Sequence, residues 1–222
     1  MWCIPPEQNA AFVCAMENVL EVYKRPHDPS RPVICLDETS KQLVKEIQQP
    51  LVCPGKPKRY DYEYQRNGTA NVFMLCEPLA GWRKVNITDR KTRTDWAAQI
   101  KELVDQHYPD AQRITLVMDN YCTHQLSSLY ELFPPPEARR LIEKIEVVHT
   151  PKHGSWLNMA EIELSVLGRQ CTEGRIPDMD TLKAQVKNWE RDRSHRTMKI
   201  DWHFTTADAR IKLRRLYPKL MA

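Results

Sequence analysis

The chain has 222 residues, of which 41% are hydrophobic and 28% charged, with a net charge of +4. This length suits one substantial core with a small appendage. The seven cysteines are odd in number and form no C-x-x-C pair, so neither a disulfide framework nor a four-ligand zinc site is indicated. The longest apolar run is only about as long as residues 72–76, so we expect a cytoplasmic protein without a signal peptide or membrane span.

The first half of the chain predicts a helix followed by antiparallel strands. Apolar residues recur at helical spacing over 8–24, and an apolar, β-branched strand follows at 33–37. Two further strands, 60–65 and 70–77, flank Asn67-Gly68. Because Asn-Gly is the strongest short hairpin signal, we expect these three strands to form an antiparallel group.

The next part of the chain alternates helices and strands. Thr94 is the expected N-cap of a helix that Pro109 stops. Buried strands are expected at 114–118 and 145–149, and a helix from about 158 to 171. Three antiparallel strands followed by helix-separated parallel strands fit a ribonuclease-H-like α/β fold, in which acidic residues collect at neighbouring strand ends.

Basic residues concentrate near the C-terminus. Residues 181–222 contain 11 Lys and Arg against 4 Asp and Glu, whereas the rest of the chain contains 22 against 25. Lys and Arg contacts release counterions from a phosphate backbone, so this distribution suits an enzyme that grips a polyanion. The alternative is a solvated amphipathic helix over 211–216. The basic residues that we select as DNA contacts in this region are Arg210, Lys212, Arg214 and Arg215.

Three acidic residues stand at the edges of expected core elements. Asp37 ends the first strand, Asp119 follows the strand at 114–118, and Glu161 lies in the opening turn of a helix. Carboxylates cost too much to bury alone, so three brought together suggest a bound divalent cation. Two such ions about 3.5–4 Å apart can activate a nucleophile and stabilise a leaving oxygen. The pattern favours phosphodiester chemistry, with Asp37 as the bridging ligand.

Each of these acids also has a purely structural interpretation. Asp37 can cap a strand end beside Glu38, and Asp119 can begin an Asx turn. Asn158 and Glu161 have the spacing of a capping box, in which the glutamate reaches back to the N-cap amide. Taken one at a time, the three residues therefore leave both interpretations open.

The polar neighbours of these acids are less specific. Glu163 competes with Glu161 as a ligand, but residues two apart on a helix point about 200° apart, so only one can face the metals. Lys152 and His153 precede that helix and can either contact a phosphate or pack within their loop. His124 is too isolated to indicate zinc, and we interpret it as a side chain on a helix surface.

The segments around the three acids resemble a known family. Asp37, the run Asp119-Asn-Tyr-Cys-Thr-His124 and above all His149-Thr-Pro-Lys-His-Gly-Ser-Trp-Leu-Asn-Met-Ala-Glu161 resemble the catalytic domain of bacterial insertion-sequence transposases of the mariner-like superfamily. The likeness runs nearly end to end, and the third motif is its most specific part. In this superfamily the third acid follows an Asn-x-x pattern, which falls on Glu161 rather than Glu163.

The resemblance implies a ribonuclease-H-like fold whose triad of Asp37, Asp119 and Glu161 uses Mg²⁺ or Mn²⁺, as two ions. It further implies cutting of transposon ends and joining of the freed 3′-hydroxyl to double-stranded target DNA, typically at a TA dinucleotide. We divide the chain into an entry helix with a remnant linker (1–30), the catalytic domain (31–175) and a basic helical extension (176–222). A nucleoid location is expected, and a homodimer is a candidate assembly.

One departure from the family pattern bears on specificity. Such transposases generally have an N-terminal helix-turn-helix region of roughly a hundred residues that reads the transposon ends, whereas here about 30 residues precede the first strand. We therefore expect catalytic competence with weak sequence discrimination. Two alternatives are a non-catalytic remnant that binds DNA or a full-length transposase, and a structure-selective nuclease such as a junction resolvase or ribonuclease H.

Overall fold

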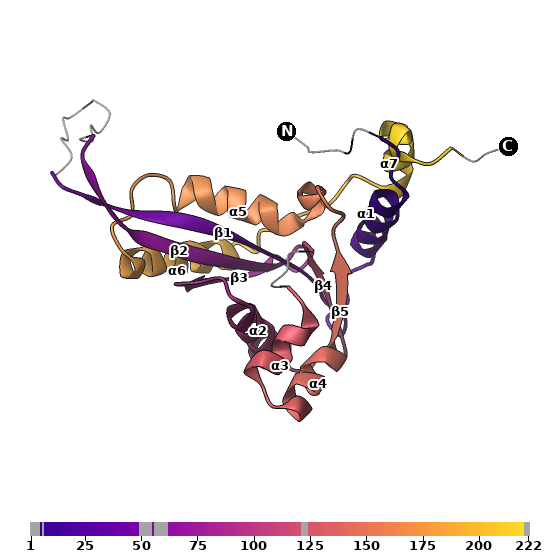
Figure 1. Cartoon of the computed structure of the whole chain (residues 1–222), viewed down its shortest axis with the longest axis horizontal. Helices are drawn as coiled ribbons and strands as arrows, with labels where there is room; N and C mark the ends of the chain where they lie inside the picture. Colours follow the sequence, from indigo (N-terminus) through magenta and orange to yellow (C-terminus); the bar gives the residue numbers. More distant parts are fainter. Residues whose placement is uncertain (1–4, 6, 49–54, 56–61, 121–123, 220–222) are drawn as a thin grey trace.

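The computed structural model describes residues 5, 7–48, 55, 62–120 and 124–219 (Figure 1). Its centre is a mixed sheet of five strands in the order β3-β2-β1-β4-β5. β1 pairs antiparallel with β2, and β2 with β3, while β4 lies parallel to β1, and β5 to β4. The strands are β1 (Val33–Glu46), β2 (Tyr64–Glu77), β3 (Trp82–Thr88), β4 (Ile114–Met118) and β5 (Ile145–His149). This topology confirms the predicted ribonuclease-H-like fold class.

Helices cover both faces of this sheet, because side chains alternate between the faces along each strand. Ile34 and Leu36 pack with one group of helices, whereas Cys35 packs with the other. The first group is α2 (Arg93–Glu102), α3 (Leu129–Leu132) and α4 (Pro135–Lys144). The second is α1 (Ala10–Tyr23), α5 (Met159–Gln170), α6 (Met179–His195) and α7 (Thr206–Lys212). None of the helices in the described residues is long and apolar enough to cross a membrane.

The first strand is longer than predicted, and Asp37 does not end it. β4 pairs with β1 only over 33–35, but β2 continues to pair with β1 as far as Glu46. Figure 1 shows β1 and β2 leaving the body of the sheet as a long ribbon. Asp37 therefore lies where the parallel pairing stops rather than where the strand stops, because an antiparallel partner is enough to keep the backbone extended.

The prediction of a hairpin at Asn67-Gly68 is wrong. β2 runs unbroken through this pair, and the register with β1 shifts between Gln42 and Val44. The two residues thus form a bulge, which Gly68 permits with a φ of 88°. The real turn joins β2 to β3, a strand that we did not predict, and it passes through Gly81. Residues 60 and 61 of the predicted hairpin lie outside the described part of the chain.

Gly81 is required at the β2–β3 turn for two reasons. Its φ is 70°, a conformation that other residues rarely adopt. A Cβ built on Gly81 would also lie 2.8 Å from the backbone carbon of Thr197. The turn and the segment after α6 can approach each other this closely only because the side chain is absent.

Several helices and strands confirm the sequence predictions, with differences at their ends. The predicted elements at 8–24, 114–118, 145–149 and 158–171 correspond to α1, β4, β5 and α5.

Two helix starts differ from the predictions. Thr92, not Thr94, caps α2, because Thr92 forms a capping box with Asp95. The basic helix predicted at 211–216 instead starts earlier, after the cap at Thr205, and gives way to a 3₁₀ turn at Arg214–Leu216.

The N-terminal and C-terminal helices share one core cluster with the sheet. Phe12 and Val19 of α1, together with Ala209 and Leu216, belong to the cluster that also contains Cys35. The backbone amide of Asn9 donates to the carbonyl of Leu216 at 2.9 Å, and Figure 1 shows α7 beside α1. The segments that we assigned to an entry helix and to an extension therefore pack against each other.

Candidate active site

Asp37 and Glu161 line one open cleft between β1 and α5. Asp37 is two residues beyond Cys35, so the alternation along a strand directs its side chain to the sheet face that α5 covers. The cleft has a polar floor of strand residues and a helical wall. Its lining residues are Asp37, Glu38, Thr39, Ser40, Lys41, Val72, Glu161, Leu164, Ser165, Leu167, Gly168 and Thr172. Two of the three predicted acids are thus brought together.

Asn158 fixes the start of α5 beside Asp37. Its side-chain amide donates to the carbonyl of Leu36 at 2.7 Å, and its side-chain oxygen accepts from the amide of Ala160 at 3.1 Å. The predicted capping box between Asn158 and Glu161 is not formed, since Asn158 binds the amide of Ala160 instead. One buried carboxamide therefore joins β1 to α5 next to the cleft.

Glu163 lies in different surroundings from Glu161. Its side chain is fully buried and contacts Arg83 Nε at 3.2 Å and Arg193 Nη2 at 2.7 Å. Arg193 also donates from Nε to Glu163 at 3.1 Å. Two guanidinium groups thus neutralise Glu163 inside the protein, while Glu161 faces the cleft. The spacing argument that only one of the two can face a metal agrees with this arrangement.

Asp119 follows β4 and is held by His124. The ring nitrogen Nδ1 of His124 lies 2.6 Å from Asp119 Oδ1, and Nε2 lies 3.0 Å from Glu38 Oε2. The interpretation of His124 as a helix-surface residue was wrong: its side chain is 1% exposed, because two carboxylates draw it inward and Trp96 stacks on its ring. Residues 121–123, between Asp119 and His124, lie outside the described part of the chain.

Burial and neighbouring charges shift the pKa values of Asp37 and His124. Burial raises the pKa of Asp37 to about 7, and the negative charges of Asp119, Glu38 and Glu161 add to this rise, although the backbone amide of Glu38 opposes it. Burial alone would lower the pKa of His124, but its contacts with Asp119 and Glu38 outweigh burial and raise that pKa to about 9. The region around Asp37 therefore carries an excess of negative charge.

The donor set fits a hard divalent cation. Asp37, Asp119 and Glu161 offer carboxylate oxygens, which are the ligands that Mg²⁺ and Mn²⁺ prefer. The influence of Asp119 and Glu161 on the pKa of Asp37 reflects repulsion that a cation would relieve. Among the described residues, however, no three acidic, His or Cys side chains already stand close enough to hold a metal ion. His124 occupies one oxygen of Asp119 in this arrangement.

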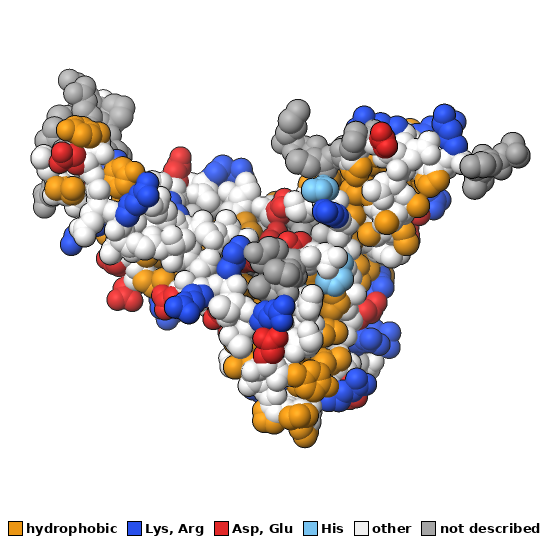
Figure 2. Space-filling view, viewed as in Figure 1, with side chains coloured by type: hydrophobic (Ala, Val, Ile, Leu, Met, Phe, Trp, Pro, Cys, Tyr) orange, Lys and Arg blue, Asp and Glu red, His pale blue; other side chains and the backbone are white. Residues whose placement is uncertain are grey.

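Figure 2 shows how charged side chains gather around this region. Acidic side chains lie near the centre of the face, where β1, β4 and the start of α5 converge in Figure 1, and Lys, Arg and His side chains surround them. Lys152 and His153, which were predicted to contact phosphate, are exposed on the loop between β5 and α5. Neither is among the described residues that line the cleft.

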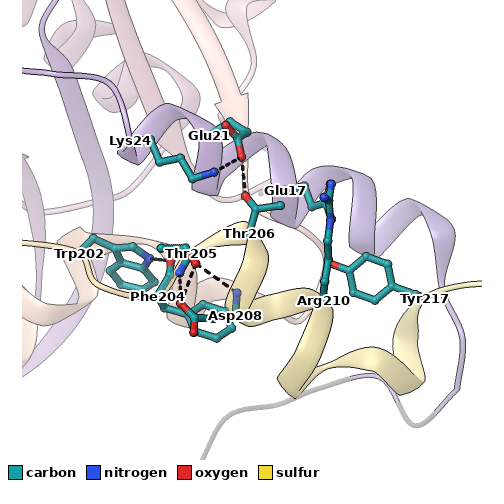
Figure 3. A network of polar contacts seen from close by, with 10 residues as sticks. All are labelled: Glu17, Glu21, Lys24, Trp202, Phe204, Thr205, Thr206, Asp208, Arg210 and Tyr217. Atoms are coloured by element: carbon teal, nitrogen blue, oxygen red, sulfur yellow. Dashed lines mark hydrogen bonds and ion pairs between the residues drawn. The ribbon is translucent and has the colours of Figure 1, made fainter.

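The predicted basic contacts near the C-terminus differ in their surroundings. Arg210 donates from Nε and Nη2 to the two carboxylate oxygens of Glu17, each at 2.9 Å (Figure 3). Lys212 lies 4.0 Å from Asp208. Arg214 and Arg215 are exposed on the 3₁₀ turn after α7. Their roles as DNA contacts stay predictions, and Arg210 has an internal partner.

Comparison with protein families identifies the class of this protein. Residues 32–183 match the family model described as DDE superfamily endonuclease. The match covers more than half of the chain and includes Asp37, Asp119 and Glu161. The chain therefore belongs to the DDE superfamily of endonucleases.

Several similar solved structures are complexes of the Mos1 transposase. Its paired end complex with Mg is 16% identical, with a TM-score of 0.58 over 97% of this chain and 66% of that one. The paired end complex with Mn is 17% identical, with a TM-score of 0.55 over 88% and 60%. The paired-end complex with the left transposon end is 16% identical, with a TM-score of 0.56 over 88% and 60%.

At these identities the likeness is one of fold, and it agrees with the ribonuclease-H-like architecture. In the complexes with Mn and with the left transposon end, the matched region includes 88% of this chain but only 60% of the Mos1 chain. A comparison with curated protein sequences gave no match.

Proposed function

We propose that this chain is the catalytic domain of a DDE transposase, which uses divalent cations to cut DNA and to transfer the freed strand. The observation that carries the proposal is the convergence of Asp37 and Glu161 on one cleft, with Asp119 at the neighbouring strand end. Membership of the DDE endonuclease family supports the nuclease chemistry. The similar Mos1 structures are paired-end complexes, one with the left transposon end, one with Mn and one with Mg. They support DNA and these cations as ligands of this chain.

Asp37, Asp119 and Glu161 would hold the cations in this proposal. Two bound divalent ions supply activation of a water or 3′-hydroxyl and stabilisation of the leaving oxygen. Asp37 must lose its proton to act as a ligand, and a pKa of about 7 makes this loss possible near neutral pH. Asn158 keeps Glu161 near Asp37 by joining the first turn of α5 to the backbone of β1.

Double-stranded DNA is the partner that fits the distribution of charge. Lys152, His153 and the C-terminal Arg214 and Arg215 are exposed and free to approach phosphates on the described surface. The proposal also includes strand joining at TA dinucleotides, assembly as a homodimer, and a location at the nucleoid in the cytoplasm. Each is taken from the family resemblance.

Nicking of supercoiled plasmid tests the chemistry without knowledge of the transposon ends. We expect nicking by the intact chain with Mg²⁺ or Mn²⁺, and none with a chelator or with Asp119→Asn, because this change removes a ligand charge while keeping the side-chain shape. Equal nicking by the intact chain and Asp119→Asn would remove the triad from the mechanism.

The same assay separates the proposed activity from related nucleases. Duplex DNA, branched DNA and an RNA–DNA hybrid are offered side by side under identical metal conditions. A transposase domain should act on duplex DNA, and join a 3′-hydroxyl end to it. Preferred cleavage of the hybrid would indicate a ribonuclease H, and preferred cleavage of branched DNA would indicate a junction resolvase.

A further inference from the structure

A buried chain of three side chains connects β1 to the segment after β4. His124 lies between Asp119 and Glu38, with contacts of 2.6 Å and 3.0 Å from its two ring nitrogens. The side chains of His124 and Glu38 are 1% and 5% exposed, whereas that of Asp119 is 36% exposed. Only the Asp119 end of this chain of contacts therefore reaches the surface.

The ring of His124 is oriented by more than these two contacts. Trp96 stacks on it, with ring centroids 6.2 Å apart and planes 29° apart. Lys91 lies 3.7 Å from the other oxygen of Glu38, which limits how that carboxylate can rotate. The contact of Nδ1 with Asp119 is a hydrogen bond, whereas Nε2 approaches Glu38 as a charge–charge contact at 3.0 Å. The arrangement is a buried, charged support for one carboxylate oxygen of Asp119.

A buried ionic group is weak evidence for stability by itself, since the cost of removing charges from water can exceed their attraction. Its position next to the acids is more informative. Glu38 directly follows Asp37, and His149 Nδ1 lies 3.2 Å from the backbone oxygen of Asp119. The side chain of Asp119 is thus connected through His124 to the strand that carries Asp37, and its backbone is connected to β5.

We propose that Glu38 and His124 form a positioning pair, which holds the Asp119 carboxylate in the orientation that the divalent cation requires. The inference rests on the proposed function, because it takes Asp119 as a metal ligand. His124 acts through Asp119 and does not itself bind the cation. Groups that orient metal ligands in this way typically change metal affinity by roughly 10–100-fold when they are removed.

Charge and positioning predict opposite results for His124→Leu. Removal of a cationic ring beside a cation site should strengthen metal binding if charge alone matters. Loss of the support for Asp119 should weaken it. We expect Mn²⁺ binding, measured by isothermal titration calorimetry, to weaken by roughly 10–100-fold in His124→Leu. Tighter or unchanged binding in this variant would overturn the positioning role.

A second variant restores part of the contact. The side-chain amide of Asn can occupy the place of His Nδ1, so His124→Asn keeps a donor for Asp119 and loses the contact with Glu38. We expect its Mn²⁺ affinity to lie between those of the intact chain and His124→Leu. If His124→Leu does not fold, as judged by circular dichroism, an affinity of His124→Asn equal to or tighter than that of the intact chain overturns the proposal.

His107→Leu is the matched control. His107 is less buried than His124, with 22% of its side chain exposed, but it has similar partners: a carboxylate oxygen of Glu102 at 3.3 Å and the ring of Trp82, with ring centroids 5.1 Å apart. It lies on the turn after α2, among other partners, and its removal should leave Mn²⁺ affinity unchanged. Absence of any Mn²⁺ binding by the intact chain would overturn the proposed function together with this inference. Binding by the intact chain with no loss in His124→Leu would overturn the inference alone.

Discussion

Helix α5 carries two glutamates whose surroundings are opposite. Glu163 is fully buried and is matched by two guanidinium groups, from Arg83 and Arg193. Glu161 lines an open cleft with Asp37, and burial together with the neighbouring carboxylates raises the pKa of Asp37. The first cluster neutralises its charge within the protein, whereas the second has an excess of negative charge. An acid that the fold has already neutralised has no charge left for an external ligand, whereas a cluster of acids with excess negative charge is suited to an external cation.

The largest expected effect separates the two glutamates by activity. Glu161→Gln should reduce metal-dependent nicking to background, because it removes a ligand charge from the cleft. Its free energy of unfolding should change by less than about 0.5 kcal/mol, as is usual for a substitution without buried partners. Plasmid nicking and urea denaturation measure the two quantities. Glu173→Gln, at an exposed acid after α5, is the control and should nick normally.

The second effect is on stability. Glu163→Gln should lower the free energy of unfolding by about 3–5 kcal/mol, because it leaves the buried guanidinium of Arg83 without its counter-ion. Urea denaturation of this variant beside Glu161→Gln makes the comparison direct. Equal stability of the two variants would show that the buried cluster contributes no more than the cleft residue does.

The third effect is a pH dependence to which Asp37 contributes. Asp37 has a pKa of about 7 in the folded protein, against 3.8 ordinarily, so the folded state binds its proton more tightly than the unfolded state does. The stability from this proton is complete below about pH 4 and is lost as pH rises through about 7. In a chelator, the melting temperature of the intact chain should therefore fall between pH 5 and 8. Asp37→Asn should show a smaller fall, and an equal fall would contradict the assignment.

The smallest effect extends the comparison to the basic residues. Arg210 is matched by Glu17 (Figure 3), whereas Arg214 and Arg215 are exposed on the next turn. Arg214→Ala or Arg215→Ala should reduce the salt dependence of DNA binding by about one counterion each. Arg210→Ala should change it less. A larger change for Arg210 would mean that DNA displaces its carboxylate partner.

The fold class could be predicted from the sequence because burial patterns and motifs can be recognised within short segments of the chain. The runs before Asp119 and Glu161 predict a buried strand and a helix start, and both are present. The length of β1 was not predictable in this way, since β2 sustains the strand beyond Asp37. Asn67-Gly68 indicates a turn locally, but a longer partner strand converts the pair into a bulge.

The candidate site was predicted only in part. The chemistry of Asp37, Asp119 and Glu161 follows from their residue types and settings. The burial of His124 depends on Glu38, which is distant in the sequence and gives no local signal. The sequence places a histidine five residues after Asp119, but its isolation from other zinc ligands led to the interpretation as a surface residue.

The hydrogen bond from Asn158 to Leu36 spans 122 residues of the chain. Contacts of such large sequence separation form slowly, because a long loop must close before they provide any stabilisation. During synthesis the first strand leaves the ribosome long before its partner helix exists. A nascent chain therefore cannot assemble the proposed cleavage centre until both Leu36 and Asn158 have been made, so the proposed activity has to wait for this long loop to close.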